Sequence, residues 1–120
     1  MHQALPGSLA LLAIAAIGCG GAAIPHEQLA SSQASIRAAE EIGANSYPTA
    51  ELHLRFAKDQ VEKARALIAD DENEEAKLVL QRAQADADLA IAITKESSVR
   101  TEAERALAQV RELRQQISQR

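Results

Sequence analysis

The fold is decided by the stretch AKLVLQRAQADADLAIAIT, residues 76–94. Small and apolar residues return through it at steps of three and four, which is the period of one helix face. This face consists of Ala76, Val79, Leu80, Ala83, Ala87, Ala90 and Thr94. Because alanine buries little area per residue, we expect thin helices that pack closely together.

The surrounding sequence predicts a long helix. No Pro or Gly occurs from Thr49 to Arg120, and aromatic residues make up only 2% of the chain. A third helix is expected to begin near Glu72 and can run to the C-terminus, a length on the order of 70 Å at 1.5 Å per residue. Two shorter helices cannot cover a partner of that length.

The two earlier helices are predicted from the Gly and Pro residues that mark their ends. The first is expected over 27–42, ending at Gly43, with Leu29, Ile36 and Ala39 on its apolar face. A turn at 45–48 leads to the second, which should start near Thr49 because Pro suits a first helical position. Its predicted apolar stripe is Leu52, Phe56, Val61, Ala64, Leu67 and Ile68. The fold class is therefore all-α, as an antiparallel helical hairpin or a three-helix arrangement with a long C-terminal helix.

A second repeat occupies the C-terminal part of the chain. Its apolar residues are spaced four, three, four, three and four: Val99, Ala103, Ala106, Val110, Leu113 and Ile117. This set, called the seam below, is typical of a coiled coil and predicts an interface for a partner helix. Arg100 is expected to pair with Glu96 and Glu104. The two repeats fall out of phase at 95–98, which indicates either a hinge or break there or a third helix that continues through this segment. The domain boundary is placed at this point, between a three-helix domain at 27–94 and an extension at 95–120.

Acidic residues are concentrated at 70–75, where five of six positions are Asp or Glu. The segment lacks the alternate ligand spacing and mid-loop Gly of an EF-hand, so no metal site is predicted. The expected role is structural. Asp71 would cap the third helix, and Glu72, Glu74 and Glu75 would lie in its first turn near the positive end of the dipole.

The N-terminus resembles a lipoprotein export signal. Residues 1–26 contain no Lys, Arg, Asp or Glu, and an apolar run at 9–17 is too short to span a bilayer comfortably. The sequence Ala16-Ile17-Gly18-Cys19 resembles the bacterial lipobox, in which the Cys is lipidated and becomes the mature N-terminus. The resemblance implies a signal peptide at 1–18 and a lipidated flexible tether at 19–26. Ala16, where Leu is usual, and the missing basic residues depart from the pattern.

Cys19 has one alternative interpretation besides lipidation. It would be a free thiol in an uncleaved anchor, although Gly18, Gly20 and Gly21 weaken that segment as a helix. If lipidation occurs, Gly20 after the Cys fits the sorting pattern for the outer membrane. The expected location is then the cell envelope, anchored by lipid and facing the periplasm, because two or more acyl chains give stable attachment.

Catalytic and nucleic-acid chemistry are not predicted. The net charge is −4, with no concentrated basic face. The three His residues share no metal-ligand spacing, the only Cys is the expected lipid site, and no phosphate loop or nucleophile elbow occurs. We therefore expect no enzyme activity, no metal, no cofactor and no small-molecule substrate.

One family resemblance covers residues 30–95. It is carried by Gly43-Ala44, Tyr47-Pro48, Glu51-Leu52, Ala57, Ala64, Glu75-Ala76 and Asp86-Ala87-Asp88-Leu89-Ala90. These resemble an alanine-rich lipoprotein family of Gram-negative bacteria known as domain of unknown function 4398. The resemblance implies a turn followed by two helices rich in Ala, Leu and Glu, together with an envelope location. It implies no catalytic residue.

Two functional hypotheses fit these observations. The first is a non-enzymatic envelope lipoprotein whose third helix engages another helix, from its own copy or from a partner. The second is a periplasmic carrier or assembly factor that holds apolar cargo between loosely packed helices. A groove between helices would favour the second.

Overall fold

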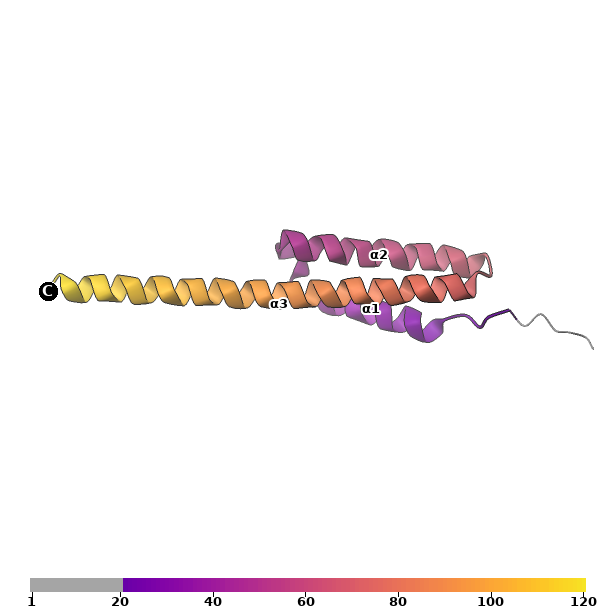
Figure 1. Ribbon diagram of the computed structural model, residues 1–120, viewed down its shortest axis with the longest axis horizontal. Coiled ribbons are helices and arrows are strands. Elements are labelled where there is room, and N and C mark those ends of the chain that lie inside the picture. Colours follow the sequence, from indigo (N-terminus) through magenta and orange to yellow (C-terminus); the bar gives the residue numbers. More distant parts are fainter. Residues whose placement is uncertain (1–20) are drawn as a thin grey trace, which may run out of the picture.

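The computed structural model describes residues 21–120, and all regular elements in this range are helical (Figure 1). Helix α1 spans His26–Glu41, the 3-10 helix η1 spans Ala44–Ser46, α2 spans Pro48–Ala69 and α3 spans Asn73–Ser118. The all-α class and the long C-terminal helix are thereby confirmed. Cys19 and the predicted signal at 1–18 lie outside the described residues.

Both ends of α1 and the first residues of α2 and α3 lie within one residue of their predicted positions. Gly43 has φ 83°, a left-handed conformation that glycine adopts without steric cost, and its N–H donates to the carbonyl of Glu40 at 3.0 Å. Pro48 occupies the first position of α2, where its missing N–H is not needed. The short η1 between them reverses the chain.

The three helices run up, down and up. Ser31 of α1 donates to Gln84 of α3 at 3.0 Å, and the chain just before α1 contacts the start of α3, so these helices are parallel. Helix α2 returns antiparallel to α3. Figure 1 shows α1 and α2 on either side of one half of α3, while the other half continues alone to the C-terminus. Helix α3 has 46 residues and is about 69 Å long.

The core is built mainly from alanine, as the composition predicts. Leu54 and Leu80 are the largest fully buried apolar side chains, and the helices approach closely around them. All seven face residues quoted from 76–94 are buried. Close approach lets these small side chains make many dispersion contacts, which wider spacing would lose.

The predicted stripe of α2 is wrong at two of its members. Leu52 and Phe56 are 39% and 44% exposed, and the buried positions are Ala50, Leu54, Ala57, Val61 and Ala64. These lie four and three residues apart, so the inward face is the one that carries alanine. Alanine allows α2 to lie close to α3, and Leu52 and Phe56 point outward.

The chain enters the domain at the end where α2 turns into α3. Asn73 Nδ2 donates to the carbonyl of Ala22 at 2.9 Å, and Pro25 is buried. The chain at Ala22, within the predicted tether at 19–26, thus contacts the first turn of α3. Figure 1 places this entry at the end of the molecule opposite the C-terminus.

Asp71 ends α2 instead of capping α3. It has φ 61°, and its N–H donates to the carbonyl of Ile68 at 3.1 Å. The N–H of Glu72 donates to the carbonyl of Leu67 at 2.8 Å. This pair of bonds is a Schellman motif, with Asp71 in the left-handed position that usually holds glycine. The predicted cap is wrong because α3 begins later, at Asn73, after Glu72.

Replacing Asp71 by Gly is expected to stabilise the domain by about 0.5 kcal/mol, and Asp71→Val to destabilise it by about 1–2 kcal/mol. Glycine relieves the strain of a positive φ, although it also adds freedom to the unfolded chain. Urea unfolding followed by circular dichroism measures both effects, with Asp71→Asn as the near-neutral control. A lower midpoint for Asp71→Gly than for Asp71→Val would contradict the assignment.

Candidate partner-helix interface

The seam lies on the half of α3 that extends beyond the other helices. From Val99 to Ser118 the side chains are exposed, apart from the half-buried Thr101. Val99, Leu113 and Ile117 are 63%, 57% and 74% exposed. All six predicted interface residues therefore lie on one uncovered helix, and this apolar surface is free for a partner.

The helix is continuous through 95–98, which settles the alternative left open by the sequence. Hydroxyl groups bond back to carbonyls one turn earlier, from Thr94 to Ala90 at 2.7 Å and from Thr101 to Ser97 at 2.9 Å. Such bonds are compatible with an unbroken helix. The break is absent because the change of apolar repeat moves the apolar face around the helix without interrupting the backbone bonds.

The seam does not continue the face that packs against α1 and α2. At 100° per residue, its centre lies about 150° around α3 from the centre of the buried face at 76–94. Helix α3 therefore has two apolar faces. One is used within the domain, and the other points away from it.

The outward face also extends back along the domain. Leu78 and Leu89 are 56% and 43% exposed, Ala85 and Ala92 are exposed as well, and all four share the phase of the seam. We call these four residues and the seam together the outer stripe. Only Arg82 and Glu96 interrupt it. Continuing the three-and-four spacing backward from Val99 would have found this extension in the sequence.

Charged side chains flank the outer stripe. Glu96 forms an ion pair with Arg100 one turn later, as expected, whereas no ion pair between Arg100 and Glu104 is formed within residues 21–120. Lys95 and Glu102 lie along one edge of the stripe, and Arg100 and Arg114 along the other. An exposed pair of this kind contributes little to stability, but such charges select the partner and its direction.

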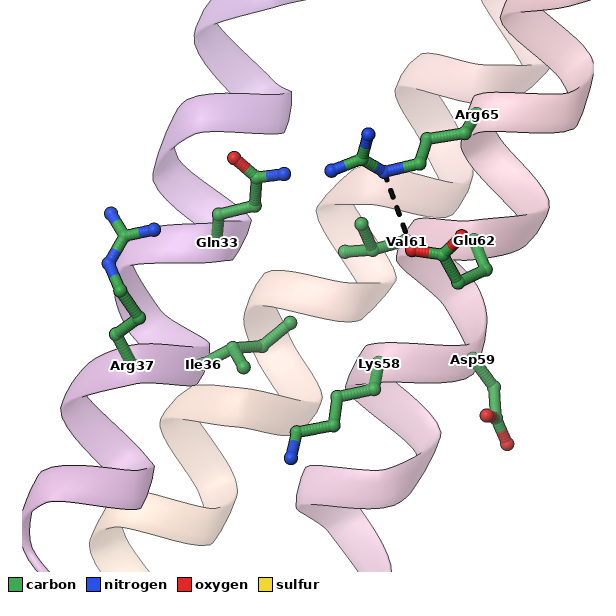
Figure 2. Close-up of a pocket in the computed structure, with 8 residues that line it drawn as sticks. All are labelled: Gln33, Ile36, Arg37, Lys58, Asp59, Val61, Glu62 and Arg65. Carbon is green, nitrogen blue, oxygen red and sulfur yellow. Dashed lines mark ion pairs between the residues drawn. The ribbon is translucent and has the colours of Figure 1, made fainter.

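A groove separates α1 from α2. It encloses about 410 Å³, and Figure 2 shows Ile36 of α1 and Val61 of α2 between charged side chains at its edges. Arg65 pairs with Glu62 at 3.4 Å beside it. Lining residues are Gln33, Ile36, Arg37, Lys58, Asp59, Val61, Glu62 and Arg65. The groove therefore has a small apolar floor with polar and charged side chains at its rim.

A hydrogen-bonded cluster ties α2 to α3. Asp86 accepts a bond from Gln60 Nε2 at 2.8 Å, and its other oxygen lies 2.9 Å from Nδ1 of His53. Both carboxylate oxygens are thus engaged by α2. Phe56 packs edge-on against the His53 ring, with centroids 6.0 Å apart. Within residues 21–120, no three His, Cys, Asp or Glu side chains gather as metal ligands.

Comparison with known proteins identifies the family. The family model described as "Domain of unknown function (DUF4398)" matches residues 27–106. The chain belongs to this family. The DUF4398 region takes in α1, α2 and α3 as far as Ala106, so it includes the first three seam residues, and the resemblance seen at 30–95 is confirmed. No curated protein and no solved structure matches the chain.

The predicted lipid site and the seam belong to different ends of this DUF4398 chain. Cys19 lies outside the described residues, close in sequence to Ala22, which is fixed at the start of α3. The seam begins at Val99 and follows α3 to the opposite end. None of the helices within residues 21–120 has the length and apolar character needed to cross a bilayer.

Proposed function

We propose that this protein is a non-enzymatic cell-envelope lipoprotein, anchored at Cys19 and facing the periplasm from the outer membrane, that acts as a helical interaction module. The outer stripe of α3 carries this proposal. It exposes Leu78, Leu89, Val99, Val110, Leu113 and Ile117 along one helix. Exposed apolar surface on this scale is typical of protein interaction sites.

The arrangement of the two ends supports the same proposal. An anchor near Ala22 would hold the start of α3 beside the membrane, and the tip of α3 lies about 70 Å away along the helix. Such a protein gives a partner helix a long, rigid apolar surface that begins close to the anchored end. Helix pairing of this kind is recognised by residues three and four apart.

Lipidation is tested by labelling cells with a palmitate analogue. We expect the full-length protein to incorporate the label and Cys19→Ala to lose it, because acylation requires the thiol. Cys19→Ser is the second variant, since it preserves side-chain size. An unlabelled wild type whose N-terminus lies upstream of residue 19 would recast the segment as an uncleaved anchor.

The interaction role is tested by ending the chain after Thr101. This truncation removes no buried residue, so the free energy of unfolding should change by less than about 1 kcal/mol. Proteins captured by crosslinking to the full-length chain in cells should be lost from the truncated one. Retention of every crosslinked product would contradict a role for the projecting half.

A carrier of apolar cargo is the second candidate, and the groove between α1 and α2 is the observation that favours it. Its apolar lining is limited to Ile36 and Val61 among six polar or charged residues. Ligand sites for apolar molecules are mainly hydrophobic, so the interaction module is the better supported of the two. Lipid or peptide retained in native mass spectra would favour the carrier.

A further inference from the structure

We propose that the outer stripe pairs with the outer stripe of a second copy of this chain, in antiparallel direction, over its full length from Leu78 to Ile117. This inference rests on the proposed interaction role and names the partner. It places Leu78 against the partner's Ile117, Ala92 against the partner's Ala103, and Glu96 against the partner's Val99. Every pair joins an a position of one helix to a d position of the other, as antiparallel coiled coils require.

The charged residues within the stripe oppose a parallel pair. In a parallel pair in register, Arg82 would face the partner's Arg82 and Glu96 the partner's Glu96 in the same layers of the interface. Lys95 would also meet the partner's Arg100 at the edge. Like charges brought together in this way are unfavourable, most of all when they lose water. In the antiparallel pair, Arg82 and Glu96 each meet an apolar side chain.

The edge charges select one antiparallel register. Lys95 meets the partner's Glu102, and by symmetry Glu102 meets the partner's Lys95, which gives two attractive pairs. A shift of one heptad in one direction brings Lys95 against the partner's Lys95, and in the other direction Glu102 against the partner's Glu102. Pairing only the projecting halves would bring Arg100 against the partner's Arg114. The full-length register is therefore the complementary one.

The domain leaves this surface accessible. The centre of the stripe lies about 170° around α3 from the centre of the face that holds α1 and α2, so a second α3 can approach without displacing them. A strip about 60 Å long and about 10 Å wide covers roughly 600 Å² on each copy. The total is comparable with the lower end of specific protein interfaces. The two chain entries then lie at opposite ends of the paired rod.

Thiol crosslinking tests the direction and register of the pair. In the full-length chain carrying Cys19→Ser, we would prepare Ala92→Cys and Ala103→Cys separately, and treat each alone and then mixed with a short bismaleimide. The mixture should give several-fold more crosslinked dimer than either variant alone. Ala92→Cys mixed with Ala108→Cys, which lies on the other side of the helix, is the matched control. Circular dichroism confirms that each variant is folded.

Two crosslinking results would overturn the proposal. Efficient linking of each variant to itself, with no gain on mixing, would show a parallel pair. No product above the control would show that no such pair exists. If a different protein is still captured in cells and is lost in the chain ending at Thr101, the interaction role survives and only the identity of the partner fails. If that capture also fails, the proposed function falls as well.

Charge reversal at the edge gives a second test that is independent of crosslinking. Lys95→Glu should weaken the antiparallel pair about 5- to 10-fold by sedimentation, because two attractions become two repulsions. Adding Glu102→Lys should restore it. In a parallel pair, Lys95→Glu would instead remove a repulsion with the partner's Arg100 and strengthen association, which would contradict the proposal.

Discussion

Replacing Val110 and Leu113 together by Asp is expected to weaken association through α3 by at least roughly 10-fold, because two apolar contacts are lost and the carboxylate at position 110 would have to lose water in an apolar interface. Both side chains are exposed in the isolated chain, at 44% and 57%. Folding should therefore be unaffected, and the free energy of unfolding should stay within about 0.5 kcal/mol of the wild type. Sedimentation velocity and crosslinking in cells measure the loss.

The matched control for this variant is Ala108→Asp with Gln115→Asp. Both residues are exposed and lie on the other side of the projecting half, so the control adds the same charge to the same helix segment. It should associate as the wild type does. Equal loss in both variants would indicate a general charge effect, and no loss in either would remove the seam as an interface.

Leu80→Ala is expected to have the largest effect on folding, a loss of about 3 kcal/mol in the free energy of unfolding. Leu80 is fully buried in a core composed mostly of alanine, where neighbouring side chains are too small to fill the cavity. For a domain of this size, such a loss is a large part of the total stability. Urea unfolding followed by circular dichroism is the measurement.

Leu89→Ala provides the comparison, since it makes the same substitution on the same helix at a side chain that is 43% exposed. In dilute solution, where copies of the chain do not associate, it should lower the free energy of unfolding by less than about 1 kcal/mol. Equal losses at the two positions would mean that α3 does not bury the face at 76–94 against α1 and α2.

Much of the fold could be predicted because the local signals agree. Gly43 and Pro48 bound the first two helices, and the absence of Pro and Gly after Thr49 predicts the long third helix. Burial in α2 could not be predicted by choosing its largest apolar residues. In a thin alanine core, closeness of the helices decides burial, so Ala57 lies inside and Phe56 outside.

The candidate interface could be predicted only in part. Spacing from Val99 to Ile117 identified the seam, but the sequence pattern alone did not show how this face is oriented relative to the core. The structure adds that α1 and α2 occupy another side of α3, so Leu78 and Leu89 extend the same surface. Asp71 was misassigned because a residue in the left-handed position after one helix and a cap of the next have similar compositions.

The most direct test of the interaction role is site-specific photocrosslinking in cells, with the reactive residue placed at Val110 in one strain and at Ala108 in another. Both positions are exposed on the projecting half of α3, and only Val110 belongs to the outer stripe. We expect a discrete crosslinked product from position 110 and little or none from position 108. Absence of a product at position 110, or equal products from both positions, would contradict the role of the outer stripe.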